Sequence, residues 1–373
     1  MKALVYHGPG QISLDEISQP AIQNATDAIV KITKTTICGT DLAILKGGVS
    51  TVAPGRVLGH EGVGVVEAVG SGVANFKPGD HVLISCITAC GKCEYCKREM
   101  YSNCLDGGWI LGNTIDGVQA EYVRVPYADN GLYHIPTCMA EEAALMLADI
   151  IPTGLEVGVL NGEVKFGDTL AIIGAGPVGL AALLAAQFYS PAQIIVIDLD
   201  ENRLAVAKRL GATFTVNNRQ GQAVAAVMEL THGRGVDVAI EAVGNPATCE
   251  LVQAIIGVGG RIANVGVYAK SAELHKQLLW TRNITLRMGV VNTRTIPLLL
   301  KTVQAGKLDP TRLITHHFRF DEIRQAYDVF ANAAQEQAIK IILSTNQAAT
   351  TTGLATDQAL IEQLVAKVLA KVT

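Results

Sequence analysis

TLAIIGAGPVG, at residues 169–179, is the most informative stretch of this 373-residue sequence. A short apolar run leads into a Gly-x-Gly-x-x-Gly spacing that opens a segment of helical composition. In such a motif the first glycine makes a tight turn, the second lets the backbone approach a pyrophosphate, and the third lets helix pack on strand. The free N–H groups at the start of the helix then face the anion. The stretch predicts a dinucleotide site, with a glycine-rich packing turn as the alternative; its residues are Gly174, Gly176, Pro177, Val178 and Gly179.

The sequence after this motif alternates short apolar runs with helical stretches, the first helix being expected over 177–188. Asp198 ends the second run, where its carboxylate can accept both ribose hydroxyls and repel a 2′-phosphate, which favours NAD over NADP. Arg203 can neutralise a 2′-phosphate, so NADP stays open. Apolar strands between helices are typical of a doubly wound parallel sheet covered on both faces. Six strands are expected, at 169–173, 193–197, 214–216, 236–240, 261–265 and 284–288.

The first 152 residues follow a different pattern, with short runs separated by glycine and by turn signals. Residues 120–125 alternate at period two, which is typical of a half-buried strand. This part predicts an all-β, barrel-like domain, so the chain as a whole is expected to be α/β. Residues 293–344 predict a helix, a loop and one last strand at 338–343 that returns to the first domain.

The composition excludes several classes of protein. The chain is 49% hydrophobic and only 17% charged, so it has ample material for buried cores and disorder is excluded for most of it. A net charge of -4 gives no basic face for a nucleic acid or an anionic membrane. Neither a signal peptide nor a long apolar stretch is visible. A cytoplasmic location with reduced thiols is expected.

Four of the eight cysteines are spaced as C-x2-C-x2-C-x7-C, at Cys90, Cys93, Cys96 and Cys104. Zinc takes four thiolates tetrahedrally, and close spacing lets one loop surround the ion. Two-residue separations rarely suit disulfide geometry. The spacing therefore predicts a closed, structural metal site, with an iron–sulfur cluster as the alternative.

A second set of candidate ligands is spread over the first 150 residues. Cys38 begins the stretch CGTD, His60 is followed by Glu61, and Asp149 ends the apolar stretch LMLAD. A catalytic zinc needs three protein ligands and one open position. Spacing alone leaves two interpretations: a metal site, or a core cysteine, a hydrogen-bonded histidine and a carboxylate paired with an arginine or a helix end.

Together these motifs resemble the zinc-dependent medium-chain alcohol dehydrogenases, over about residues 1–344. The resemblance rests on the glycine motif, the four-cysteine stretch, CGTD at 38–41 and GHE at 59–61, in that family's order. It implies a GroES-like catalytic domain over 1–152 and 293–344, and a Rossmann domain over 153–292. It also implies two zinc ions and one dinucleotide per subunit, in a homo-oligomer that is a dimer or a tetramer.

The resemblance also implies roles for individual residues. Cys38, His60 and Asp149 match the catalytic zinc ligands, and Glu61 matches a neighbouring carboxylate that can approach the metal. Thr40 matches the hydroxyl that hydrogen-bonds the substrate oxygen. The other matches are Trp109 in the substrate pocket, Asp198 and Arg203 at the adenosine ribose, and Thr153, Val243, Val265, Gly266, Val267, Met288 and Val290 around the nicotinamide.

These roles imply reversible hydride transfer between NAD and a small primary or secondary alcohol. Many members of the family have a proton-relaying histidine three residues after the position of Thr40, where this chain has Ala43. The proton is therefore expected to leave by another route. Two alternatives stay open: a zinc-dependent polyol or amino-alcohol dehydrogenase, and a non-catalytic nucleotide-binding protein of the same fold.

The C-terminal residues extend beyond the usual end of this family. Residues 345–356 are small and polar, as in a flexible linker, and residues 357–372 carry an apolar stripe at helical spacing. The pattern resembles the encapsulation peptides of bacterial microcompartment enzymes, which dock on shell or cargo proteins. It implies a location inside such a compartment, with packing between subunits or an incidental tail as alternatives.

Overall fold

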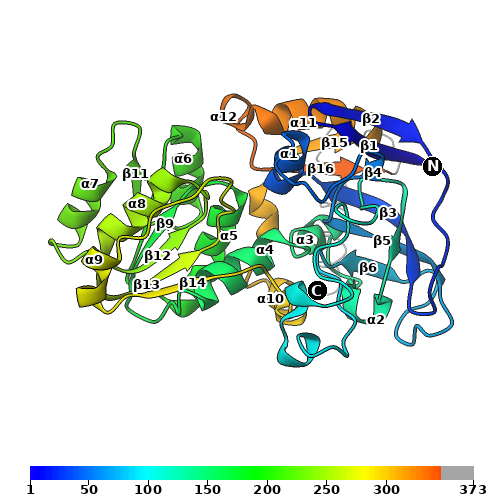
Figure 1. The fold of residues 1–373 in the computed structure, drawn as a ribbon, viewed down its shortest axis with the longest axis horizontal. Helices are drawn as coiled ribbons and strands as arrows, with labels where there is room; N and C mark the ends of the chain where they lie inside the picture. Colours follow the sequence, from blue (N-terminus) through cyan, green and yellow to red (C-terminus); the bar gives the residue numbers. More distant parts are fainter. Residues whose placement is uncertain (346–373) are drawn as a thin grey trace, which may run out of the picture.

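The computed structural model describes residues 1–345, which form two regions side by side (Figure 1). One region, drawn in green and yellow, contains a parallel sheet between helices. The other, drawn in blue, cyan and orange, is rich in antiparallel strands. The predicted C-terminal linker and amphipathic helix lie outside the described residues.

The green and yellow region is built on a six-stranded sheet in which every neighbouring pair is parallel. Across the sheet, the order of the strands changes direction between the strands at 169–173 and 236–241, which are the first and the fourth along the chain. Doubly wound folds bind their ligands at this position. The predicted doubly wound sheet is confirmed. The strands, in spatial order, are β11 (Phe214–Asn217), β10 (Gln193–Asp198), β9 (Thr169–Ile173), β12 (Val236–Glu241), β13 (Ile256–Asn264) and β14 (Thr285–Met288).

Helices cover this sheet on both faces (Figure 1). The helix predicted over 177–188 ends at Ala186, because the chain tightens there into a 3₁₀ turn, η4 (Gln187–Tyr189), before Ser190 adopts a left-handed conformation. A π-helix, η3 (Gly154–Leu160), leads into the region and packs against the same helix. The α-helices are α4 (Ile150–Thr153), α5 (Pro177–Ala186), α6 (Glu201–Arg209), α7 (Ala223–Leu230), α8 (Pro246–Ile255) and α9 (Lys276–Leu279), with the 3₁₀ turn η5 (Trp280–Arg282).

The second region has a seven-stranded sheet and a three-stranded sheet. Burial alternates along β7 (Tyr122–Val125), as the period-two pattern predicts. The larger sheet runs β15 (Ile314–Arg319), β16 (Lys340–Ser344), β3 (Ala28–Thr36), β5 (Gly62–Val69), β6 (His81–Ile84) and β8 (Leu132–His134), with β7 also paired to β3. The smaller runs β2 (Gln11–Glu16), β1 (Lys2–Gly8) and β4 (Arg56–Val57). Short helices connect these strands: α1 (Gly39–Leu45), α2 (Ala128–Gly131), α3 (Glu141–Leu145), η1 (Cys96–Arg98) and η2 (Tyr101–Asn103).

The prediction of one helix and one strand over 293–344 is wrong, because this segment holds two strands. The sequence did not indicate β15 because most of its residues are polar. Exposed and half-buried residues alternate along it, since this strand lies at the edge of its sheet. β15 and β16 are parallel, so a helical crossover must join them. β16 pairs with the end of β3, which leads directly to Cys38. The helical elements are α10 (Ile296–Gln304), η6 (Pro310–Leu313), η7 (Phe320–Glu322), α11 (Ile323–Ala331) and α12 (Ala333–Glu336).

Among residues 1–345, no helix combines the length and the apolar character that crossing a membrane requires.

Candidate metal centres and cofactor cleft

The fold brings Cys38, His60, Glu61 and Asp149 together, and one ligand atom from each lies within 4.8 Å of all the others. Cys38 follows β3 and caps α1, the His60–Glu61 pair precedes β5, and Asp149 precedes α4. Asp149 Oδ2 lies 3.4 Å from His60 Nε2 and 3.9 Å from Cys38 Sγ. We call these four residues the open site.

The buried donors of the open site shift one another's pKa values. Burial lowers the pKa of His60, but contacts with Asp149 and Cys38 outweigh it and hold this pKa well above its ordinary value. Burial raises the pKa of Asp149, yet the hydrogen bond with His60 leaves it lowered overall. A thiolate, an imidazole and carboxylates are the donors that zinc takes, so these residues fit a zinc ion.

Asp41 lies behind His60 and is fully buried. Its Oδ2 accepts hydrogen bonds from Cys38 N at 2.9 Å and from Gln119 Nε2 at 3.2 Å. Its Oδ1 lies 3.8 Å from His60 Nδ1 and has no other partner among the described residues. Tyr327 donates to Gln119 Oε1 at 2.8 Å and closes the network. A carboxylate behind a ligating histidine fixes the ring orientation.

Lys340, on β16, is completely buried and pairs with Glu61. Its Nζ donates to Glu61 Oε1 at 2.8 Å, to Oε2 at 3.0 Å and to the carbonyl of Ile37 at 3.3 Å. Burial lowers the pKa of Lys340, but Glu61 outweighs it and raises this pKa. Sequence reasoning missed Lys340 and Asp41. The available signals were a lysine inside the apolar run AIKIIL and the last residue of CGTD.

Two residues expected at the substrate, and one expected near the nicotinamide, also lie beside the open site. Thr40 Oγ1 lies 3.7 Å from Cys38 Sγ. The ring of Trp109 meets His60 edge-on, with 6.0 Å between ring centroids. Thr153 Oγ1 donates to Asp149 Oδ1 at 2.5 Å. A hydroxyl and an apolar wall therefore adjoin the candidate metal ligands.

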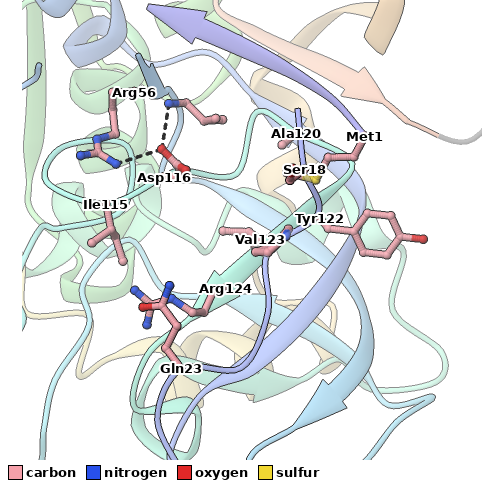
Figure 2. A pocket seen from close by; sticks show the side chains of 13 residues that line it. Met1, Ser18, Gln23, Arg56, Ile115, Asp116, Ala120, Tyr122, Val123 and Arg124 are labelled. Atoms are coloured by element: carbon pink, nitrogen blue, oxygen red, sulfur yellow. Dashed lines mark hydrogen bonds and ion pairs between the residues drawn. The ribbon is translucent and has the colours of Figure 1, made fainter. Parts of the chain in front are cut away.

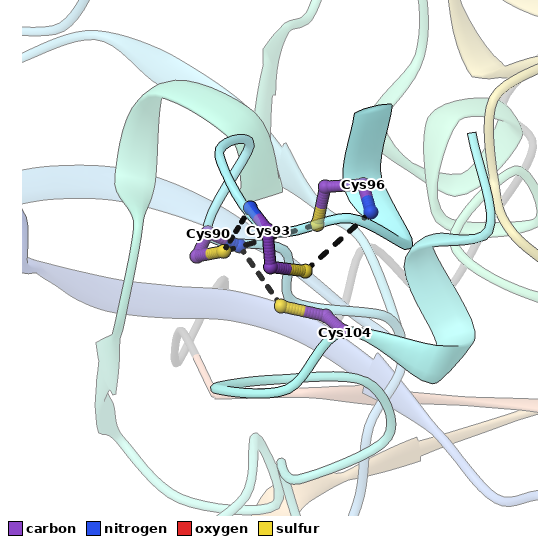
Figure 3. A group of neighbouring side chains, drawn as sticks. All are labelled: Cys90, Cys93, Cys96 and Cys104. Carbon is purple, nitrogen blue, oxygen red and sulfur yellow. Dashed lines mark hydrogen bonds between the residues drawn. The ribbon is translucent and has the colours of Figure 1, made fainter. Parts of the chain in front are cut away.

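Figure 3 shows the second cluster, in which Cys90, Cys93, Cys96 and Cys104 converge within one loop. Cys90 Sγ and Cys96 Sγ lie 3.9 Å apart, and all four thiols are free. A tetrahedron with zinc–sulfur bonds of about 2.3 Å has edges of about 3.8 Å, so this spacing fits one zinc ion. The iron–sulfur alternative spreads thiolates over several irons and is disfavoured. We call residues 90–104 the cysteine lobe.

Backbone amides of the cysteine lobe point at its sulfurs. Cys90 N donates to Cys104 Sγ at 3.2 Å, and Cys93 N donates to Cys90 Sγ at 3.4 Å. Hydrogen bonds from the backbone of Leu105 and Cys96 lower the pKa of Cys93 to about 6. Burial raises the pKa of Cys96 to about 12. Without a cation the four sulfurs cannot all carry charge, so this donor set also fits a divalent metal.

The glycine motif has the geometry that its sequence predicts. Gly174 adopts φ +99°, and a Cβ there would lie 2.6 Å from Val243 Cγ2. A Cβ on Gly179 would lie 1.9 Å from the carbonyl oxygen of Gly174, so this close approach of helix and strand requires glycine. Gly176 caps α5, with Pro177 at its first position. The motif therefore places the start of α5 at the carboxyl ends of the parallel strands.

Asp198 lies at the end of β10, next to this motif. Its Oδ2 accepts from Ala175 N at 2.6 Å, and its Oδ1 accepts from Leu199 N at 2.7 Å and from Asp200 N at 3.0 Å. A carboxylate has about four acceptor positions, so Asp198 keeps capacity for a ribose hydroxyl. Arg203 Nε is buried without a partner among the described residues.

Apolar side chains are exposed near the ends of β12, β13 and β14. The exposed fractions are 46% for Val243, 86% for Val267, 65% for Met288 and 60% for Val290. Val265 and Gly266 precede Val267, and their N–H groups donate to the carbonyl of Glu241 at the end of β12. Ligands of doubly wound folds bind outside the carboxyl ends of the strands, which is where these residues lie.

A cavity of about 310 Å³, shown in Figure 2, lies away from all of these residues. It is lined by the N-terminus and by residues of β4 and β7, and Arg56 Nη1 pairs with Asp116 Oδ1 across one side at 2.9 Å. None of the predicted site residues lines it.

Comparisons with known proteins agree with this geometry. The family described as "Alcohol dehydrogenase GroES-like domain" matches residues 24–137, and "Zinc-binding dehydrogenase" matches residues 177–305. An alcohol dehydrogenase of Cupriavidus necator is 37% identical over 89% of this chain and 95% of its own length. An NADP-dependent isopropanol dehydrogenase of Thermoanaerobacter brockii is 34% identical over 88% and 95%. The apo structure of zinc dependent alcohol dehydrogenase 2 from Streptococcus pneumonia is 54% identical, covers 94% of this chain and 100% of its own, and has a TM-score of 0.89.

Proposed function

The chain belongs to the zinc-dependent medium-chain alcohol dehydrogenases, and from this premise we propose that it interconverts a small primary or secondary alcohol with its aldehyde or ketone, using NAD. The observation that carries the proposal is the open site, whose four donors lie within 4.8 Å of one another beside Thr40 and Trp109. We take residues 1–152 and 293–344 as the catalytic domain and residues 153–292 as the NAD-binding domain.

Cys38, His60 and Asp149 would hold a catalytic zinc ion, with Glu61 next to it. When bound, zinc supplies a Lewis acid that lowers the pKa of the alcohol, and NAD supplies the hydride acceptor. Thr40 Oγ1 is placed to accept a hydrogen bond from the alcohol and to hold its proton. Ala43 offers no acceptor on α1, so the proton must leave Thr40 without help from that position. Trp109 excludes water and gives the alcohol an apolar wall.

The cofactor is proposed to lie along the carboxyl ends of the strands of the six-stranded sheet. The start of α5 receives its pyrophosphate, and the exposed Val243, Val267, Met288 and Val290 cover its nicotinamide. Asp198 favours NAD because its carboxylate accepts ribose hydroxyls and repels a 2′-phosphate. The cysteine lobe is proposed to hold a second, structural zinc ion, since its four ligands leave no open position.

The test is turnover by the zinc-loaded chain, followed at the absorbance of NADH. Short primary alcohols, secondary alcohols, diols and polyols are supplied in parallel with NAD and with NADP. We expect turnover of a short alcohol, with NAD preferred. Exchanging Thr40 for Val should lower kcat/KM by about 10²–10⁴-fold with zinc content unchanged, because a positioned proton acceptor is lost. The matched control is Thr137→Val, since Thr137 is exposed and lies outside the open site.

Two results would replace the proposal. Turnover confined to polyols or amino alcohols would assign the chain to that activity instead. NADH binding without any turnover by a chain with two zinc ions would support the non-catalytic alternative.

We further propose that the chain forms a homo-oligomer through β14. This strand lies at the edge of the six-stranded sheet, and all four of its residues are exposed. Trp280 is 74% exposed nearby in the sequence. An edge strand with exposed apolar neighbours is a template for pairing with a second copy. Leu286→Asp should lower the mass measured by light scattering, whereas Leu105→Asp, at an exposed position that follows the cysteine lobe, should not.

The C-terminal segment is proposed to be an address for a microcompartment of the cytoplasm. This proposal rests on sequence, because residues 346–373 lie outside the described part of the chain. A reporter fused to residues 346–373 should gather with its cognate shell. A reporter that stays diffuse beside the shell would favour packing between subunits.

A further inference from the structure

The chain passes between its two regions twice, around α4 and again over residues 289–295, between β14 and α10. We call residues 289–295 the second passage. It contains no helix or strand. Its second residue is Val290, one of the exposed apolar residues of the proposed nicotinamide wall. Its position therefore has to be set by side chains from other segments.

Glu156, on the π-helix η3, holds the second passage from one side. Its carboxylate is buried and accepts hydrogen bonds from Asn292 N at 2.9 Å, from Thr295 N at 2.8 Å and from Thr295 Oγ1 at 2.8 Å. Hydrogen bonds to an ionised carboxylate are shorter and stronger than neutral ones. Glu156 therefore ties the first crossing of the chain to the second.

The cysteine lobe holds the second passage from the other side. Asn292 Oδ1 accepts from Ser102 N at 3.0 Å and from Ser102 Oγ at 2.9 Å. Ser102 lies between the third and fourth cysteines of the lobe. Arg294 Nη1 also pairs with Glu99 Oε2 at 3.0 Å. Two successive contacts thus join the lobe to a segment almost 200 residues away in sequence.

Thr293 shows that these contacts override the preference of the backbone. It is buried and adopts φ +58°, in the left-handed region that branched residues avoid. Its hydroxyl meets Ser85 Oγ at 2.8 Å. Such a conformation persists only where the surroundings determine it, and it occurs most often at functional sites.

We propose that the cysteine lobe positions the Val290 wall of the cofactor cleft, and that Asn292 is the positioning residue through which it does so. Asn292 is bonded to Glu156 through its N–H and to Ser102 through its side chain, so it joins both crossings and the lobe. The inference rests on the proposed function, because it concerns NAD binding. It gives the lobe a role in cofactor affinity in addition to stability.

The test compares Asn292→Ala, Ser102→Ala and the double variant with the wild-type chain loaded with zinc. NADH binding is measured by fluorescence titration, together with zinc content and Tm. Asn292→Ala should raise the Kd for NADH by roughly three- to tenfold, as expected when one or two hydrogen bonds are lost. Ser102→Ala should have a smaller effect, because it keeps the hydrogen bond from Ser102 N to Asn292 Oδ1. The double variant should come close to Asn292→Ala, because the other contact of Ser102 with the second passage, from Oγ to the carbonyl of Val290, is long at 3.5 Å. The control is Lys97→Ala, at an exposed position of the lobe, which should bind NADH like the wild type.

Asn292→Asp keeps an acceptor for Ser102 and should restore most of the affinity. Hydrogen exchange at residues 288–295 should speed up in Asn292→Ala with two zinc ions still bound. A lower Tm with unchanged NADH affinity would mean that the contact is structural only, and would overturn the inference. A wild-type chain that binds no NADH would instead refute the proposed function, so the two failures are distinguishable.

Discussion

The two metal-ligand clusters are assembled in opposite ways. The cysteine lobe draws its ligands from Cys90–Cys104, and its own backbone N–H groups donate to the sulfurs. The open site draws on three separate stretches between Cys38 and Asp149, and its supporting groups, Asp41 and Lys340, are buried side chains. A site in which one loop supplies all four ligands needs little support from the rest of the fold. A site that leaves a position for a substrate takes its ligands from several segments, so the rest of the fold must position them.

The largest effect is expected from removing a ligand of the open site. His60→Ala should lower kcat/KM by at least about a thousandfold, because Lewis-acid stabilisation worth several kcal/mol is lost. Zinc content should fall from two ions to one while the lobe keeps its ion. His7→Ala, at an exposed position, serves as the control. Full loss of both ions would show that the two clusters are not independent.

Breaking the lobe should affect stability first. Cys93→Ser should lower Tm by roughly 10 °C, since the free energy of a structural zinc site is folding free energy. The open site should retain its ion, as measured by metal analysis. Cys138→Ser, at an exposed thiol, should leave Tm unchanged. An unchanged Tm in Cys93→Ser would show that the metal site of the lobe does not stabilise the fold.

Lys340 tests how much the open site depends on its buried support. Lys340→Met should cost about 3–5 kcal/mol of unfolding free energy, because Glu61 is left as an uncompensated buried charge. Adding Glu61→Gln should recover most of that loss in denaturant titrations. If the double variant were no more stable than Lys340→Met, the ion pair would not be the cause.

Asp41→Asn should weaken zinc at the open site by about 10–100-fold, which is the usual effect of removing a carboxylate behind a ligating histidine. Competition with a chelator measures it. The lobe should hold its ion with unchanged affinity, since no side-chain carboxylate lies behind its sulfurs among the contacts described for Cys90–Cys104. If zinc affinity fell equally at both sites, the open site would not depend on buried side chains more than the lobe does.

The smallest effect is expected at a carboxylate that belongs to neither cluster. Burial raises the pKa of Glu142, but hydrogen bonds from Lys34 and His317 leave it below the ordinary value of 4.5. The ionised form therefore stabilises the fold above pH 4.5, and this contribution is lost as the pH falls through the lowered pKa. Glu142→Gln should remove about 0.5 kcal/mol at pH 7 and nothing at the acid end. Urea unfolding at several pH values measures it.

The parallel sheet could be predicted because its central strands β9 and β10 are buried on both faces, which makes each of them a nearly continuous apolar run. The edge strand β15 could not, since polar residues occupy four of the six positions of ITHHFR and leave no apolar run. The same distinction holds in the sites. The cysteine lobe is readable from spacing, and the glycine motif from its flanking strand and helix. The open site could be assembled only through the family resemblance, because its residues are close in space and distant in sequence.

The supporting residues were beyond reach for the same reason. Lys340 looks like an ordinary polar position of a strand until β16 is placed beside β3, where the side chain meets Glu61. Gln119 carries no motif, and only the fold shows that it links Tyr327 to Asp41. Asn292 lies in a passage without regular structure, so no periodicity could single it out.

Lys340 and Glu61 are 279 residues apart, and this separation affects the order in which the two metal sites can form during synthesis. A ribosome that adds about 5–20 residues per second releases Cys104 long before it releases Lys340. The lobe can therefore take up its ion while most of the chain is still being made. Glu61 must wait for nearly the whole chain before its buried partner arrives, so truncated products should carry one metal ion and no activity.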